Sequence, residues 1–323
     1  MHKKLMTLAL AASLLAGCAS QTEEKIPTIG IAQLVDQTSL NTIREAMIDE
    51  LDNLGYKDGE TVNIDYQNAA GKADVLNTIM NKYDGEGADE IIAIATGTAQ
   101  SAQNLSDHIP VIFSAVADPV GAGLVETLEE PGGNITGTSF VVQVDQILDL
   151  MKEMDPDIKT IGCLYTPGET NGVYTLHKFE DEAEKRGYTI VEATGTDLTT
   201  LQQAQAKLLE ECDAIYSPND NIVASGMTAL AQQAVDAGIP YFVSADSMVA
   251  DGGLATVGID YEELGRETAR MAVEVLEGKS PADIPVKVFQ DDLSTYVNKD
   301  TLEKLGDKVK TPSSDKLVML GTN

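Results

Sequence analysis

The sequence predicts an α/β protein of two lobes, each a doubly wound parallel sheet, joined by a three-strand hinge. Strand and helix patterns alternate along most of the chain, which is typical of βαβ units. The second half repeats features of the first half in the same order. The chain has 323 residues, which is enough for two domains that each have their own core.

The first half alternates regularly between the two patterns. Strands are expected at 28–35, 62–66, 90–95 and 111–114, and the last two are short, continuous apolar runs of the buried parallel kind. A helix is expected at 40–54, where apolar residues recur at helical spacing and Gly55 provides a stop. A second helix is expected at 75–83.

Four features of the first half return in the second half. The segment TIGI at 28–31 returns as TIGC at 160–163, and LGY at 54–56 returns as RGY at 186–188. An Ile-Pro pair occurs at 109–110 and again at 239–240, and a Gly-Gly pair occurs at 132–133 and again at 252–253. The offsets, 120 to 132 residues, are too long for a solenoid repeat. These recurring features therefore indicate two lobes of the same architecture.

The connections between the lobes can also be placed. The chain is expected to leave lobe 1 at 137–142, to return at 258–261, and to cross a third time near 290–292. The return is needed because the helix at 264–276 and the strand at 286–289 have no partner left in lobe 2. Lobe 1 is thus predicted to comprise 27–139 and 259–289, and lobe 2 to comprise 140–258 and 290–323. Such a hinge can close two lobes around a ligand.

The N-terminus resembles an export signal. Residues 1–18 read MHKKLMTLALAASLLAGC, with two lysines before a short apolar run. The segment Leu15-Ala16-Gly17-Cys18 resembles a lipobox, which implies a signal peptide at 1–17, cleavage before Cys18 and a lipid on that cysteine. Residues 18–26 would then tether an extracytoplasmic protein to the membrane, at the cell surface or in the periplasm. An ordinary secretory signal or a buried helix is the alternative.

Composition and motifs exclude several classes of protein. The formal net charge is -30, which argues against nucleic acid as a partner. The three histidines are isolated, no GxSxG motif occurs, and Gly278-Lys279-Ser280 lacks the upstream glycine of a P-loop. We therefore expect no enzyme activity, no metal and no cofactor. Cys163 and Cys212 are interpreted as small buried thiols, and a disulfide between them stays open as an alternative.

A ligand is expected beyond the carboxyl ends of the parallel strands, where two facing lobes form a cleft. The candidate ligand-binding residues at these ends are Gln33, Thr96, Thr98, Ala99, Ser114 and Ala115 in lobe 1, and Asn171, Asp220, Asn221 and Asp246 in lobe 2. Thr96 to Ala99 open a helix, which suits a carboxylate or is a plain N-cap. Asp220 and Asp246 suit an ammonium group or cap helices themselves. The combination fits a zwitterion such as an amino acid.

Longer segments resemble a known family. The segments FSAVADPVGAGLV at 113–125, PGGNITG at 131–137, DAIYSPNDN at 213–221 and GIDYEELGR at 258–266 are similar to those of the ABC-transporter substrate-binding family that includes tryptophan- and tyrosine-binding lipoproteins. The resemblance covers most of 28–305 and implies the type I periplasmic-binding fold. It also implies permease and ATPase partners and an aromatic amino acid as ligand. The chain departs from the family pattern at Thr98, where Pro or Ala is frequent, which puts the carboxylate pocket in question.

Two other functions stay open at this point. A sugar or nucleoside is the alternative ligand, although the chain has no Trp to stack on a sugar ring. A sensory binding protein that serves a membrane receptor instead of a permease is the alternative role. In each case a monomer is expected, because a clamp must be able to open.

Overall fold

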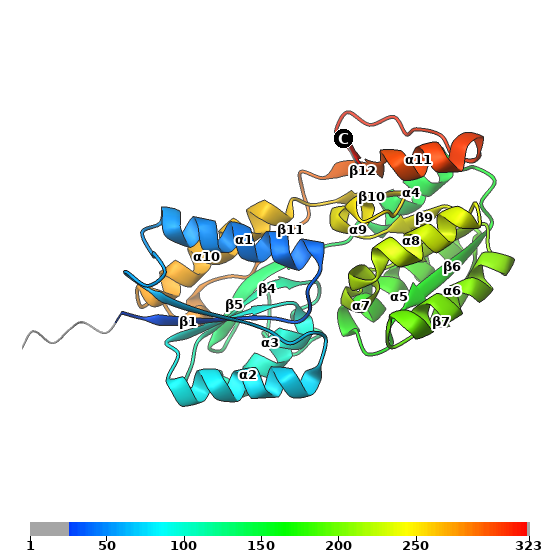
Figure 1. Cartoon of the computed structure of the whole chain (residues 1–323). Helices are drawn as coiled ribbons and strands as arrows, with labels where there is room; N and C mark the ends of the chain where they lie inside the picture. The colour runs from blue at the N-terminus through cyan, green and yellow to red at the C-terminus, as the bar shows by residue number, and fades with distance from the viewer. Residues whose placement is uncertain (1–25, 322–323) are drawn as a thin grey trace, which may run out of the picture.

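The computed structural model describes residues 26–321, and Figure 1 shows that they form two lobes side by side. The predicted signal peptide, Cys18 and all but the last residue of the predicted tether lie outside the described residues. Within 26–321, none of the helices combines the length and the apolar character needed to cross a membrane.

Lobe 1 is built on a six-stranded sheet in which every neighbouring pair is parallel. Its strands, in spatial order, are β11 (Lys287–Phe289), β5 (Ile135–Phe140), β4 (Val111–Val116), β3 (Glu90–Ile94), β1 (Thr28–Gln33) and β2 (Asn63–Asn68). Helices α1 (Thr38–Asn53) and α10 (Tyr261–Leu276) cover one face, and α2 (Ala73–Glu86) and α3 (Thr96–Ala102) cover the other (Figure 1). Short 3-10 turns follow at Gln103–Leu105 and Pro281–Asp283.

Lobe 2 is built on a seven-stranded mixed sheet. Its strands, in spatial order, are β13 (Leu317–Leu320), β12 (Ser294–Asn298), β10 (Ala255–Gly258), β9 (Tyr241–Val243), β8 (Ala214–Ser217), β6 (Thr160–Tyr165) and β7 (Thr189–Thr194). Its helices are α4 (Val144–Met154), α5 (Thr170–Lys185), α6 (Leu198–Glu211), α7 (Asn221–Ser225), α8 (Met227–Asp236), α9 (Asp246–Ala250) and α11 (Lys299–Leu305), followed by a 3-10 turn at Gly306–Lys308. Only the pairing of β10 with β12 is antiparallel among the described strands.

The chain crosses between the lobes three times, as a hinge requires. It crosses between β5 and α4, between β10 and α10, and between β11 and β12. Two of these crossings run together, because the Val141 amide donates to the Phe289 carbonyl at 3.0 Å. The predicted fold of two lobes on a three-strand hinge is confirmed, and both sheets are parallel except for the β10–β12 pair of lobe 2.

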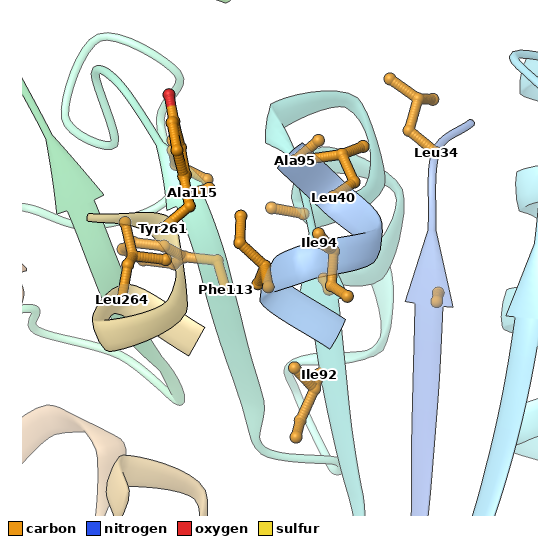
Figure 2. Packing of buried hydrophobic residues seen from close by; sticks show 14 of the residues in the cluster. Leu34, Leu40, Ile92, Ile94, Ala95, Phe113, Ala115, Tyr261 and Leu264 are labelled. Atoms are coloured by element: carbon orange, nitrogen blue, oxygen red, sulfur yellow. The ribbon is translucent and has the colours of Figure 1, made fainter. Parts of the chain in front are cut away.

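The core of lobe 1 fills both faces of its sheet, and one part of it lies between the sheet and helices α1 and α10. Figure 2 shows Ile92, Ile94 and Phe113 on the strands pointing toward these helices, and all three are fully buried. The two helices cross closely at Gly265, where an added Cβ would lie 2.4 Å from the Ile43 carbonyl oxygen. A glycine is therefore required there for α10 to reach α1 and to place its N-terminus at the interlobe face.

Both cysteines of the described chain are free and buried. Cys163 lies in the core of lobe 2 and Cys212 ends α6. Burial raises the pKa of the Cys212 thiol to about 11, so this thiol is not poised for reaction. The interpretation as buried thiols is confirmed, and the disulfide that the sequence left open is not formed.

Candidate functional site

A cavity lies between the lobes at the carboxyl ends of their strands. It encloses about 390 Å³ of empty space, part of it open to solvent. Its lining residues are Gln37, Ser39, Leu40, Ala115, Phe140 and Tyr261 on the lobe 1 side and Asn171, Asn219, Asp220, Asn221, Ala224, Ala245 and Met248 on the lobe 2 side. This is where ligands bind in open parallel sheets.

One end of the cavity is apolar and aromatic. Phe140 at the end of β5 and Tyr261 at the start of α10 meet edge to face, with ring centroids 5.9 Å apart. Leu40 of α1 and Met248 of α9 add apolar side chains to the lining of the cavity. Figure 2 shows Leu40, Ala115 and Tyr261 at the same end of the sheet. Because both rings sit beside interlobe crossings, their positions depend on how the lobes close.

The strand ends of lobe 1 bring backbone close to the cleft. Ala95 after β3 and Ala115 on β4 have positive φ angles of 80° and 59°, and the pairing of β4 with β5 is irregular between Phe113 and Val116. A positive φ is costly for alanine and is often found at functional sites. These two bends end the regular strands at the edge of the cleft, and Ala115 lines the cavity.

The other end of the cavity is polar and is built on the start of α7. Asp220 is fully buried and caps this helix, since its Oδ1 accepts from the amides of Ile222 and Val223, both at 2.9 Å. Its Oδ2 accepts from the Thr166 amide at 2.6 Å. The carboxylate thus fixes two strand ends of lobe 2 and still lines the cavity. Burial, followed by the nearby Glu169 carboxyl, raises the pKa of Asp220.

Glu169, which precedes α5, was not among the predicted site residues. Its Oε2 accepts from the backbone amide of Asn221 at 3.2 Å and from the side-chain amide of Asn221 at 2.5 Å. Burial raises the pKa of Glu169. The sequence signal was weak, because a glutamate before a helix in a Gly-Glu-Thr-Asn turn looks like an ordinary exposed residue.

Several polar atoms at the strand ends have no hydrogen-bond partner. Eight buried side-chain oxygens of the described residues lack one, and four of these are Oγ1 of Thr96, Thr98 and Thr166 and Oδ1 of Asn219. Buried polar groups are normally paired. Of these residues, Asn219 lines the interlobe cavity and Thr96 lines a neighbouring cavity, so a ligand in either would lie beside an oxygen without a partner.

The structure brings four of the predicted residues together in the cavity lining: Ala115, Asn171, Asp220 and Asn221. Thr96 instead lines a neighbouring cavity, which encloses about 640 Å³ of empty space on the same measure and also includes Asn171, Tyr174 and His177. The residue that caps α3 is Ala95 rather than a threonine, and no side chain caps that helix.

The other predicted residues lie outside the lining of both cavities. Thr98 and Ala99 are fully buried in α3. The Ser114 hydroxyl faces Thr268 at 2.9 Å, and Gln33 is held in a polar cluster with Asn41 and Arg44. Asp246 accepts from the Ser247 amide at 2.7 Å. Burial, with a smaller effect of Asp260, raises the pKa of Asp246 to about 6.

Hydrogen bonds also join the lobes directly across the cleft. The Thr38 hydroxyl donates to Asp251 Oδ2 at 2.8 Å, and the hydroxyls of Ser39 and Ser247 are bonded to each other. The Gln37 side-chain amide donates to Asn221 Oδ1 at 3.4 Å. All three bonds start at the N-terminus of α1, so this helix end is the point where lobe 1 holds lobe 2.

Comparisons with known proteins agree with this geometry. The family model described as ABC transporter substrate binding protein matches residues 28–314. The tyrosine-binding protein of Clostridioides difficile is 37% identical and covers 97% of both chains. The solved ABC domain from Streptococcus pneumoniae in complex with L-Trp is 35% identical, covers 91% of this chain and 99% of its own, and superposes with a TM-score of 0.86.

A third relative indicates the state of the lobes. The ligand-free, open structure of a substrate-binding protein with adhesive properties from Clostridium difficile is 38% identical and covers 92% of this chain and 100% of its own. Its TM-score is only 0.69, so a slightly more similar sequence superposes less well than the L-Trp complex does. The lobes of this chain are therefore placed more like those of the ligand-bound relative.

The family is one of solute-binding proteins and not of enzymes, and its fold is the type I periplasmic-binding fold. The chain belongs to the family of ABC transporter substrate-binding proteins.

Proposed function

We propose that this chain is the extracytoplasmic, lipid-anchored binding subunit of an ABC importer and that it captures an aromatic amino acid by closure of its hinge. The observation that carries the ligand is the interlobe cavity, which has an aromatic end and an acidic, amide-rich end. No lysine or arginine of residues 26–321 lines this cavity. An aromatic amino acid has matching parts, a ring and an ammonium group.

The cavity suggests how such a ligand would lie. Its ring would pack against Phe140 and Tyr261, which offer apolar and edge contacts. Its ammonium group would face Asp220 and the unpartnered Asn219 Oδ1, both of which accept hydrogen bonds. Its carboxylate would turn toward the Asn171 amide, which borders both cavities.

The relatives support this ligand and this role. One is named as a tyrosine-binding protein and another was solved with L-Trp. The partners would be a permease and an ATPase, to which a monomeric clamp presents its ligand. The acidic chain, the export signal and Cys18 support an extracytoplasmic protein held by a lipid.

The lipid anchor has its own test. The wild-type protein, made in a host that processes lipoproteins, should incorporate labelled fatty acid and enter the detergent phase on phase separation. Cys18→Ala should do neither, because the acylated residue is gone. A wild-type protein that takes up no label would contradict the lipid anchor. That result would have no bearing on the proposed ligand site.

The ligand is tested by thermal shift on protein that has been unfolded and refolded to remove bound solute. We expect stabilisation by L-tyrosine or L-tryptophan, of about 2.7 kcal/mol at a hundredfold excess over Kd. Glucose, galactose and adenosine should give no shift. A shift with a sugar or nucleoside alone would overturn the proposed ligand.

A matched pair of variants locates the binding. Phe140→Leu should weaken aromatic amino acid binding about tenfold or more, because it removes a ring from the cavity wall. Phe179→Leu changes a ring that stacks on Tyr216 in the lobe 2 core. It should lower the melting temperature of the ligand-free protein and leave Kd unchanged. Equal effects of both variants on Kd would contradict the placement of the ring.

A further inference from the structure

Glu169 and Asp220, here called the carboxyl pair, hold consecutive residues of one helix start, and of the two only Asp220 lines the interlobe cavity. Glu169 accepts from both amides of Asn221, and Asp220 accepts from the next two backbone amides. The two carboxyls are close enough for the charge of Glu169 to act on Asp220. They therefore titrate as a pair.

No cation balances this pair in the described chain. Among residues 26–321, no lysine, arginine or histidine forms an ion pair with either carboxyl. The Tyr241 hydroxyl of β9 is bonded to the Ser217 hydroxyl and brings no positive charge. Among the nearby elements, α9 carries the acidic Asp246 and Asp251, and α1 turns the neutral Gln37 and Ser39 to the cavity. His177 of α5 lines the neighbouring cavity and not this one.

Two carboxylates in such a place repel each other and lose solvation, so retention of one proton is favoured. The pKa values of both groups are accordingly raised, mainly by burial. The Asn219 Oδ1 beside them has no donor. The polar wall of the cavity thus offers hydrogen-bond acceptors and no positive charge. The ammonium group of a ligand would supply both the donors and the charge.

We propose that the carboxyl pair shares a proton in the empty cavity and releases it to solvent when the ammonium group of a ligand binds. The protonated carboxyl loses H⁺ to water, the Asp220 carboxylate then faces the –NH₃⁺ group with the Glu169 carboxylate behind Asn221, and no other bond changes. Asp220 lines the cavity and touches the ligand, whereas Glu169 acts from behind Asn221 as a specificity-determining residue. This inference rests on the proposed function, because it requires a ligand that carries an amine.

Calorimetric titration of L-tyrosine and L-tryptophan into the purified protein tests it, in buffers of different ionisation enthalpy between about pH 5.5 and about pH 8. The ligand stays zwitterionic over this range, so a change in affinity reports on the protein. Because protons compete with the ammonium group, Kd should be at least about fivefold weaker at the acidic end. Proton release, seen as a buffer-dependent enthalpy, should be largest there and fade toward the alkaline end.

Two protein variants and a ligand analogue distinguish proton release by the carboxyl pair from other causes of a pH-dependent Kd. Glu169→Gln keeps an acceptor for Asn221 and removes one charge, so it should abolish proton release and flatten the pH dependence. Glu180→Gln is the matched control, since burial also raises the pKa of Glu180, which lies on α5, but its main charged neighbour is Glu192. It should behave as wild type. The desamino analogue 3-(4-hydroxyphenyl)propionate should bind more weakly and release no proton.

The outcomes are distinct. Binding of an amino acid without proton release, or full release by Glu169→Gln with an unchanged melting temperature, overturns this inference and leaves the proposed function in place. Failure of both amino acids to bind overturns the proposed function and the inference with it.

Discussion

Glu90 is fully buried at the start of β3, and neither of its carboxyl oxygens has a hydrogen-bond partner. Burial raises its pKa well above the ordinary value. The folded protein therefore holds Glu90 protonated at a pH where the unfolded chain ionises it. Stability is then greatest below the unfolded-state pKa of about 4.3 and is lost as the pH rises toward the folded-state pKa.

Replacement of this side chain should stabilise the protein near neutral pH. Glu90→Leu removes the buried carboxyl and should raise the free energy of unfolding by about 1–3 kcal/mol at neutral pH. The gain should shrink at about pH 3.5, where Glu90 of the wild type is largely protonated in both the folded and the unfolded state. Urea denaturation at the two pH values measures it, and an equal loss of stability at both would contradict the account.

At the residue scale, the sequence located the strand ends but not the direction of each side chain. Asp220 and Asn171 were found because polar residues directly follow buried strands, and both line the cavity. Ser114 follows the same rule but faces Thr268 on α10, which packs on β4 from far along the chain. Phe140 and Tyr261 flank the hinge, and sequence alone does not separate rings that face the cleft from rings in the core.

The N-terminus of α1 acts as a latch in the closed molecule, through the bonds of Thr38 to Asp251 and of Ser39 to Ser247. Neither Thr38 nor Asp251 lines the ligand cavity. Their hydrogen bond joins the two lobes, so it should be lost when the lobes separate. It therefore favours closure without touching the ligand, and a ligand that binds the closed state gains from it.

Thr38→Val should accordingly weaken ligand binding about fivefold, which corresponds to a lost hydrogen bond of about 1 kcal/mol. The change should appear mainly as faster dissociation in stopped-flow measurements, since closure holds the ligand. Thr42→Val is the control, because the Thr42 hydroxyl donates to Thr38 O within the same helix and this bond does not change on opening. Equal Kd values for Thr38→Val and wild type would refute the latch.

At the element scale, local patterns predicted most strands and helices of lobe 1 within a few residues. The helix expected at 40–54 is α1 at Thr38–Asn53, and the strand expected at 28–35 is the shorter β1. For the C-terminal part of the chain, the sequence did not predict individual strands and helices. β12 enters lobe 2 from the hinge and runs antiparallel to β10, and β13 pairs beside it. That arrangement depends on the third crossing rather than on any local pattern.

For the whole molecule, the better superposition on the L-Trp complex than on the open relative indicates a closed arrangement. Ligand-free protein should therefore be more open than this structure. Small-angle X-ray scattering should give a larger radius of gyration without ligand and a smaller one, matching this structure, with saturating L-tyrosine or L-tryptophan. Identical curves in both conditions would argue against hinge closure as the mode of capture.

The organisation into two lobes was predictable from two features, the sequence segments that recur in both halves and the helix and strand at 264–289 that have no partner in lobe 2. Neither feature depends on the direction of a side chain. The cleft itself was not predictable in detail. Its lining combines α1, β4, β5 and α10 of lobe 1 with α5, α7 and α9 of lobe 2, and only the closed structure brings these elements together.

The most direct test of the account is a crystal structure of the protein with L-tyrosine or L-tryptophan. We expect the ring packed against Phe140 and Tyr261 and the ammonium group within hydrogen-bond distance of Asp220 or Asn219 Oδ1. A ring in the neighbouring cavity beside Thr96 and Tyr174, with the Phe140 end empty, would contradict the assignment of the site.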